Sequence, residues 1–397
     1  MTLPSKVRHI VAAGICGLLL AASPAQAGVT GTTGATGTTA ASAATGTGWQ
    51  LTDTGSTARF RGLAAVGPRT AWAAGSQGTV LRTTNGGRQW RNVSPPGAAA
   101  LEFRDIEAFD ARRAVVLAIG EGEASRILRT DDGGASWTET FRNTDARAFY
   151  DCMAFFDRRH GLALSDPVDG RYRLLSTADG GRSWSVLPSA GMPEAQPGDA
   201  AFAASGQCLT VSGSRDVWLA TGGGPTARIL HSADRGRTFE PAESTVPAGD
   251  PARGVFAVAF RGRHGIAVGG DYRPGQPSPQ AAATSRDSGR GWNPSRRPPT
   301  AYRSGVTWLP GVRTAAIAVG PTGSDLTTDS GRTWRTFDPG SFDTVDCAPG
   351  RSAAYRGRDG ATARRVPEVR HAADRARAAH RGCWAAGEKG RIARLAR

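Results

Sequence analysis

The chain has 397 residues, which is enough for one large all-β domain or two ordinary domains. It carries 49 Lys and Arg residues against 34 Asp and Glu residues, and its formal net charge is +15. The Arg residues are scattered rather than grouped, so the charge indicates attraction to an acidic partner and does not by itself indicate nucleic acid or a membrane surface.

The N-terminal residues have the features of an export signal. A basic segment precedes an apolar run at 10–22, and Ala-Gln-Ala at 25–27 provides a small-x-small cleavage site. The apolar run is too short to span a bilayer comfortably. We therefore expect a signal peptide at 1–27, a flexible linker rich in Gly, Thr and Ala at 28–48, and a secreted or periplasmic mature protein.

An eight-residue pattern recurs six times along the rest of the chain: a small hydroxylated residue, x, Asp, x, Gly, x, x and an aromatic residue. Thr83 to Trp90 is the first copy, and the aromatic residues of successive copies lie 47, 47, 55, 53 and 42 residues apart. A period near 45 residues is typical of a propeller. The third positions of the six copies are Asn85, Asp132, Asp179, Asp234, Asp287 and Asp329.

Each copy is predicted to be a structural turn, which we call an Asp box. The Asp side chain can accept hydrogen bonds from backbone N–H groups ahead of it, glycine tolerates a positive φ, and the aromatic residue begins the next strand. Metal binding or acid catalysis is the alternative. It is disfavoured because Asn85 replaces Asp in the first copy.

The segments around the Asp boxes are predicted to form the strands of propeller blades. In the first repeat, strands are expected at 62–66, 70–74, 79–83 and 89–93. Four antiparallel strands per period make one blade, and the Asp box joins the third strand to the fourth. Five further blades are predicted at 103–141, 152–187, 208–241, 255–293 and 306–337.

The C-terminal segment supplies an incomplete seventh blade. Its three strands are predicted at 342–348, 383–387 and 391–395. The segment Trp49-Gln50-Leu51 resembles a fourth strand, so we expect it to complete this blade and close the ring. The fold prediction is thus an all-β, seven-bladed β-propeller over residues 49–397, with six or eight blades as alternatives. A basic insertion at 353–382 is either a solvated surface segment or a partner-binding arm.

Four cysteines remain after removal of the signal peptide, an even number in an exported chain, so disulfides are expected. Alignment of the seventh blade on the first places Cys347 opposite Cys383 across a hairpin. Cys152 and Cys208 begin the innermost strands of neighbouring blades, where a bond would join blades 3 and 4 if the side chains converge. Metal ligation is the alternative, but there is no C-x-x-C motif and the His residues are scattered.

One face of the ring is expected to carry the turns between second and third strands, opposite the Asp boxes. The equivalent positions in these turns are Gln77, Glu121, Asp166, Gly223, Asp271, Pro321 and Glu388. Four of the seven are acidic, and around one mouth of the channel they could bind a cation, a basic peptide or a polyol. Asp169 and Tyr272 belong to the two richest segments.

A second set of charges stands at the start of the third strands. Its members are Arg126, Arg173, Arg228 and Arg391. Two interpretations remain open. Each acid pairs with a nearby Arg as a partly exposed salt bridge of little energetic weight, or the two sets together form a recognition surface.

The Thr-x-Asp-Gly-Gly-x-x-Trp turns at Thr130 and Thr177 resemble the BNR or Asp-box repeats of sialidases. A Trp-Ala-Ala-Gly strand precedes Gly78 and recurs before Gly390. With these motifs, the segment from about 49 to 395 is similar to the photosystem II stability/assembly factor-like propellers. The resemblance implies a propeller that helps to assemble a larger complex and contacts its partner through an Arg patch. Some bacterial relatives carry an oxidoreductase label, but no cofactor motif supports it here.

The resemblance to sialidases does not extend to catalysis, because the Arg-Ile-Pro segment is absent and five Tyr residues leave few candidates for the nucleophile. Two-propeller glycosidases need two carboxylates flanking the bond, and a single propeller lacks a facing domain. We therefore predict an exported, non-catalytic, monomeric scaffold without cofactor or metal. Its partner would be another protein, an acidic molecule or a glycan, but not nucleic acid. The alternative is a carbohydrate-active hydrolase that uses Asp166 and Asp271.

Overall fold

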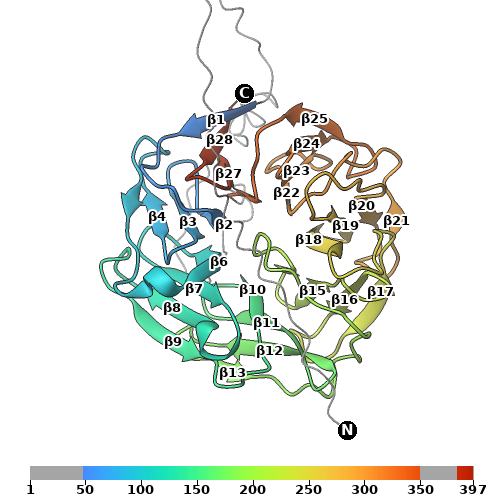
Figure 1. Ribbon diagram of the computed structural model, residues 1–397, viewed down its shortest axis with the longest axis horizontal. Coiled ribbons are helices and arrows are strands. Elements are labelled where there is room, and N and C mark those ends of the chain that lie inside the picture. The colour runs from blue at the N-terminus through green and yellow to red at the C-terminus, as the bar shows by residue number, and fades with distance from the viewer. Residues whose placement is uncertain (1–47, 349–381, 397) are drawn as a thin grey trace, which may run out of the picture. The chain divides into compact units, whose positions relative to one another are not determined.

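A computed structural model describes residues 48–348 and 382–396 of the chain. These residues form seven four-stranded antiparallel sheets, arranged as the blades of a β-propeller (Figure 1). The predicted all-β, seven-bladed fold is therefore confirmed. The predicted signal peptide lies outside the described residues, as do the predicted linker and the basic insertion except for the last residue of each, Gly48 and Gly382.

The strands of the first four blades follow one another in chain order. Blade 1 contains β2 (Phe60–Ala65), β3 (Ala71–Gly75), β4 (Val80–Thr83) and β5 (Arg91–Asn92). Blade 2 contains β6 (Glu102–Ala108), β7 (Ala114–Ile119), β8 (Arg126–Thr130) and β9 (Thr138–Arg142). Blade 3 contains β10 (Tyr150–Phe155), β11 (Gly161–Val168), β12 (Arg171–Thr177) and β13 (Ser185–Val186). Blade 4 contains β14 (Leu209–Ser212), β15 (Asp216–Ala220), β16 (Arg228–Ser232) and β17 (Glu240–Glu243).

Blades 5 and 6 repeat this order, and blade 7 takes its outer strand from the N-terminal end. Blade 5 contains β18 (Arg253–Arg261), β19 (His264–Asp271), β20 (Ala282–Ser285) and β21 (Asn293–Pro294). Blade 6 contains β22 (Gly305–Trp308), β23 (Ala316–Gly320), β24 (Gly323–Thr327) and β25 (Arg335–Asp338). Blade 7 contains β26 (Thr344–Cys347), β27 (Cys383–Ala386), β28 (Ile392–Ala396) and β1 (Gly48–Thr52). Two short 3₁₀ turns, η1 (Ala98–Ala100) and η2 (Gly122–Ala124), interrupt the connections.

The N-terminal strand β1 closes the ring, as the sequence predicts. It pairs antiparallel with β28, with Trp49 opposite Leu395; in Figure 1 β1, in blue, lies beside β28, in red. Trp49 also reaches blade 6, where its Nε1 donates a 2.9 Å hydrogen bond to Ser324 Oγ and its ring packs against Phe337. Closure pairs an edge of blade 7 that would otherwise be exposed.

The hydrophobic core lies between neighbouring blades rather than at one centre. Trp72 and Val80 of blade 1 share a buried cluster with Phe103 and Val116 of blade 2. Similar clusters join other neighbours, and the second strands of blades 4 and 7 also carry a fully buried Trp. Because successive side chains of a strand point to opposite faces of its sheet, strands covered on both faces read as nearly continuous apolar segments.

The Asp boxes are turns whose polar groups satisfy one another. In the second box, Thr130 Oγ1 accepts the amide of Gly134 at 2.9 Å, and Asp132 Oδ1 accepts the amide of Ser136 at 2.9 Å. Gly134 has a φ of 84°, which glycine adopts without strain. The Ser136 hydroxyl, followed by its amide, holds the pKa of Asp132 below its usual range. The carboxylate of this box is thus engaged by its own turn.

Both expected disulfides are present. Cys347 and Cys383 are opposite residues of β26 and β27, with Cα atoms 4.0 Å apart. Cys152 and Cys208 join blades 3 and 4, with Cα atoms 6.0 Å apart.

Candidate functional site

The turns between second and third strands lie on the same face as the connections between blades. Glu121, after β7, forms a β-bridge with Phe149, which directly precedes the inner strand of blade 3. Gly222, after β15, bridges to Ala200, in the connection between blades 3 and 4, and to Gly254, near the start of β18. The Asp boxes lie on the opposite face, because antiparallel strands reverse direction at every turn. We call these the inter-blade face and the Asp-box face.

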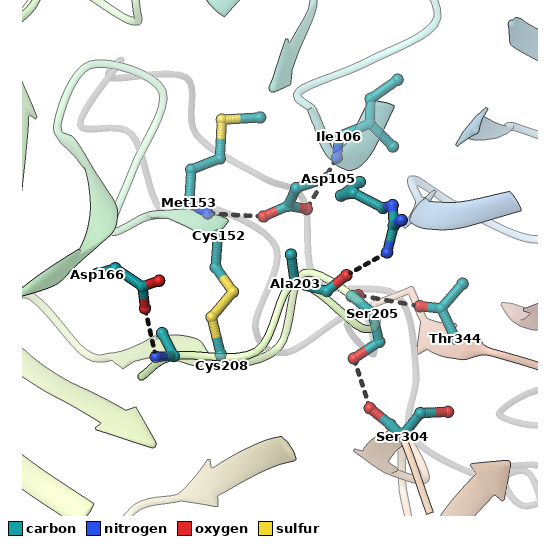
Figure 2. Close-up of a disulfide and its surroundings, with 12 residues drawn as sticks. Asp105, Ile106, Cys152, Met153, Asp166, Ala203, Ser205, Cys208, Ser304 and Thr344 are labelled. Carbon is teal, nitrogen blue, oxygen red and sulfur yellow. Dashed lines mark hydrogen bonds between the residues drawn. A yellow bond between two sulfur atoms is a disulfide. The ribbon is translucent and has the colours of Figure 1, made fainter. Parts of the chain in front are cut away.

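Two of the predicted acids on the inter-blade face, Asp166 and Asp271, are buried. Asp166 is 6% exposed, and its carboxylate accepts the amide of Ala201 at 2.8 Å (Figure 2). Asp271 is 1% exposed and forms ion pairs with Arg253 at 3.0 Å and Arg273 at 2.5 Å. Hydrogen bonding from the Arg273 side chain is the main cause that holds the pKa of Asp271 below its usual range. Both carboxylates therefore fix local structure.

The other predicted acids are closer to the solvent. Glu121 is exposed and directly precedes η2. Asp169 forms a 2.6 Å ion pair with Arg147. Glu388 is half-buried and lines a surface depression of about 500 Å³ between the end of β1 and the turn that joins β27 to β28. Each of the four turn acids thus has its own surroundings, and their role in binding stays a prediction.

The predicted arginines contact residues outside the predicted acidic set. The contacts are Arg126 with Glu139 at 3.5 Å, Arg173 with Asp145 at 3.0 Å, Arg228 with Asp199 at 2.6 Å, and Arg391 over the Phe342 ring at 4.9 Å. In none of these four contacts does a predicted arginine meet a predicted acid. The role of the four arginines in binding also stays a prediction.

The connection between blades 3 and 4 sends residues 201–208, which we call the axial segment, across the centre of the ring. Arg104 of blade 2 donates a 2.9 Å hydrogen bond to the carbonyl of Ala203 (Figure 2). Ser205 Oγ donates to the carbonyl of Ser304, beside blade 6, at 2.6 Å, and its carbonyl accepts the hydroxyl of Thr344, in blade 7, at 3.2 Å. One short segment thus contacts three blades that are not its neighbours in the sequence.

The axial segment is fixed at its C-terminal end by the Cys152–Cys208 disulfide (Figure 2). Both cysteines are fully buried. Gln207 adds two contacts across the ring, since its side chain donates to the carbonyl of Val345 at 2.9 Å and accepts the amide of Val306 at 2.8 Å. A ligand that approaches from the inter-blade face therefore meets this segment at the axis, which favours a site around the mouth over one inside a channel.

Two carboxylates, from the buried Asp105 and the half-buried Asp346, tie inner strands together below the mouth. Asp105 accepts the amides of Met153, in blade 3, at 2.6 Å and of Ile106 at 2.8 Å. Asp346 of blade 7 accepts the amide of Ala65, in blade 1, at 2.7 Å. Burial raises the pKa of Asp105 well above its usual range and that of Asp346 to about 6. These carboxylates crosslink neighbouring blades through the backbone.

A cluster of charges stands on the inter-blade face at the start of blades 1, 2 and 7. Arg59 donates hydrogen bonds to the Asp343 carboxylate from Nε at 2.8 Å and from Nη2 at 2.7 Å. Arg61 Nε, by contrast, is 3.9 Å from Asp343 and donates no hydrogen bond within the described residues, although its side chain is 20% exposed. Burial lowers the pKa of Arg61. The Nε atom is itself buried, so an anion that binds Arg61 would approach the exposed part of the side chain, where a charge-assisted hydrogen bond is strong.

An aromatic cluster borders these charges. Phe202 of the axial segment stacks on Phe256 at a centroid distance of 3.9 Å, and Tyr302 meets Phe256 edge-on at 4.7 Å. Tyr272, one of the predicted residues, is 52% exposed and packs against Phe256 at 6.1 Å. Burial raises the pKa of Tyr302, and the positive charge of Arg61 acts on the same phenol in the opposite direction. The mouth therefore carries both guanidinium and aromatic groups.

Arg61 and Phe256 are not among the predicted site residues, yet the repeats contain a signal for both. They occupy the same position in different blades, directly before the register between the first and second strands becomes regular. The equivalent residues are Arg61, Arg104, Asp151, Gln207, Phe256, Ser304 and Asp343. Alignment on the first strand, rather than on the Asp box, would have shown this ring of polar and aromatic residues.

Two further properties concern the described residues. None of the helical segments between 48 and 348 or between 382 and 396 is long and apolar enough to cross a membrane. Over the same ranges, no group of three or more His, Cys, Asp or Glu side chains is placed to hold a metal ion.

No protein-family model matches this sequence, and no curated protein matches it. Among solved structures, YCF48 bound to D1 peptide is similar with a TM-score of 0.54 and 15% identity, over 88% of this chain and 95% of that chain. YCF48 from Cyanidioschyzon merolae is similar with a TM-score of 0.53 and 13% identity, over 87% of this chain and 98% of that chain. The Neurospora crassa Pan2 WD40 domain is similar with a TM-score of 0.55 and 12% identity, over 85% of this chain and 88% of that chain. At these identities the similarity shows the propeller fold, and the predicted resemblance to photosystem II assembly factor-like propellers is supported at that level.

Proposed function

We propose that the chain is an exported, non-catalytic propeller that acts as a scaffold by binding a segment of another protein on the inter-blade face. The observation that carries the proposal is the Arg61 guanidinium, whose side chain is 20% exposed, whose buried Nε has no hydrogen-bond partner within the described residues, and whose charge acts on the phenol of Tyr302 in the aromatic cluster. A peptide that carries a carboxylate beside an aromatic or apolar side chain would match both halves of the mouth. The structure of YCF48 bound to D1 peptide supports a peptide ligand for a propeller of this fold.

The alternative function, glycoside hydrolysis, is not favoured. Such an enzyme needs one carboxyl group that can donate a proton and a second that can act as base or nucleophile. Asp271 has a lowered pKa and two arginine partners, and Asp166 accepts the amide of Ala201 in the axial segment. Asp271 therefore provides no proton donor at neutral pH.

The proposal can be tested by selection from a random peptide library on the immobilised mature chain, residues 28–397, followed by affinity measurement of the selected peptides. We expect peptides that combine Asp or Glu with an aromatic residue, and we expect Arg61→Gln to weaken them about tenfold because one charge-assisted hydrogen bond is lost. Arg237→Gln, which removes an exposed Arg of the fourth Asp box, is the matched control and should bind normally. Selected peptides that bind both variants equally well would refute this site.

A further inference from the structure

The Asp-box face has a depression that none of the features above explains. It has a volume of about 500 Å³ and is lined by Pro68, Arg69, Asn85, Gly86, Arg88 and Arg394. We call it the Asn85 pocket. It lies between blades 7 and 1, and its lining contains three arginines and no carboxylate. Its volume is in the range of small-molecule sites.

The described residues that line the pocket include no carboxylate because the first Asp box carries Asn85 where the other five carry Asp. Asn85 Oδ1 accepts the amide of Gln89 at 3.0 Å, as Asp132 Oδ1 accepts the amide of Ser136 at 2.9 Å in the second box. The amide side chain therefore preserves the turn. Its effect is to remove a carboxylate from the wall of a pocket that already contains arginines.

Comparison with the sixth box shows what this substitution changes. Arg88 Nε donates to the carbonyl of Asn85 at 3.2 Å, and the equivalent Arg332 Nε donates to the carbonyl of Asp329 at 3.0 Å. The two arginines thus have the same pose, but the charge of Arg332 acts on the Asp329 carboxylate and helps to lower its pKa, after the larger effect of burial in the opposite direction and the Thr333 and Thr327 hydrogen bonds. Arg88 faces a neutral amide instead. Within the described residues, Arg88 forms no ion pair.

A second guanidinium is fixed at the pocket wall. Arg394 Nη1 donates a 3.1 Å hydrogen bond to the carbonyl of Gly86, and the guanidinium lies over the Trp384 ring at 5.8 Å. Gly86 has a φ of 78°, and a Cβ atom at this residue would lie 3.0 Å from Arg394 Nη1. Glycine therefore allows the guanidinium group to approach the turn closely. Arg69 completes the set; it is exposed and forms no ion pair in the described part of the chain.

We propose that the Asn85 pocket binds a small phosphate-bearing anion, such as a pyrophosphate or a phosphate ester. Planar guanidinium groups match phosphate oxygens through paired hydrogen bonds, and a dianion is the ligand class that gains most from three nearby positive charges. The pocket lies on the Asp-box face, so this proposal does not depend on the protein-binding site of the inter-blade face.

Isothermal titration of the mature chain with inorganic pyrophosphate tests the proposal. We expect binding that weakens with added salt, because exposed charges are screened. Asn85→Asp should weaken it about tenfold or more, because a new carboxylate would face the anion. This variant restores the residue that the other five boxes carry, so it is expected to fold with an unchanged or higher Tm.

A pair of arginine variants separates a specific site from the general positive charge of the protein. Arg88→Gln should weaken pyrophosphate about fivefold or more by removing a charge-assisted hydrogen bond, whereas Arg332→Gln, the same change in the sixth box, should have almost no effect. Equal losses in the two variants would overturn the proposal. So would undiminished binding by Asn85→Asp, or the absence of pyrophosphate binding by the unmodified chain at low salt.

Discussion

Gly206, in the axial segment, lies directly against the carboxylate of Asp105 in the inner strand of blade 2, so that a Cβ atom on Gly206 would overlap both carboxylate oxygens. Asp105 has little freedom to move away, because it accepts the amides of Met153 and Ile106. Gly206 also has a φ of 75°, a conformation that other residues adopt with strain. The passage of the segment over the axis thus depends on a glycine at this point.

Replacement of Gly206 with Ala is therefore expected to lower the free energy of unfolding by about 3 kcal/mol, from backbone strain and overlap together. Gly213→Ala is the matched control, since Gly213 has a φ of 63° and a Cβ atom there would meet nothing within 4 Å. It should cost only about 1 kcal/mol. Urea denaturation of both variants gives the comparison. Equal losses would show that Asp105 imposes no constraint on the axial segment.

Trp49→Ala tests how strongly β1 closes the ring. The change removes the hydrogen bond to Ser324 and the contacts with Phe337 and Phe342, and the side chain is only half-buried. We expect the free energy of unfolding to fall by about 2 kcal/mol. Leu51→Ala, in the same strand, should change it by less than about 0.5 kcal/mol, because Leu51 is 55% exposed. If Trp49→Ala had no larger effect than Leu51→Ala, closure would depend on backbone pairing alone.

The fold was predictable because each repeat carries its own local signal. The Asp box requires a hydroxyl, a carboxylate or amide, and glycines with a positive φ within eight residues, and this chemistry is visible without knowledge of the rest of the chain. The closing role of Trp49 followed from counting strands, since the seventh blade lacked one. The Cys347–Cys383 pair followed from alignment of the seventh blade on the first, whereas the positions of Cys152 and Cys208 in neighbouring repeats allowed a bond only if their side chains converged, as they do.

The composition of the inter-blade face was much less predictable. Whether Asp166 faces a ligand or the protein depends on the path of the axial segment, and that path is set by long-range contacts such as those of Ser205 with Ser304 and Thr344. These residues are small and polar, and no periodicity marks them. The environment of Arg61 could not be predicted for the same reason, because it is built from three blades and the sequence does not state how these blades are placed relative to one another.

Chromogenic glycosides provide a test of the alternative function. We expect no turnover by the mature chain, because the Arg273 and Arg253 partners keep Asp271 ionised and Asp166 accepts the amide of Ala201. A glycosidase of known activity serves as the positive control for each substrate. Turnover that disappears in the Asp166→Asn, Asp271→Asn double variant would contradict the scaffold proposal and assign catalysis to this pair.

The pH dependence of stability should report the half-buried Asp346. Its pKa is raised by burial from 3.8 to about 6, so the folded protein holds the proton more tightly than the unfolded chain. This contribution to stability is complete below about pH 4, is lost as the pH rises to about 6, and changes no further above that. A shift of this size corresponds to about 3 kcal/mol at most.

Asp346→Asn cannot titrate, so its free energy of unfolding should fall less between pH 4 and 6 than that of the unmodified chain, as measured by urea denaturation at several pH values. Asp169→Asn, which removes an exposed carboxylate, is the control and should follow the unmodified chain. Parallel curves for Asp346→Asn and the unmodified chain would mean that Asp346 is ionised at the same pH in the folded and unfolded states.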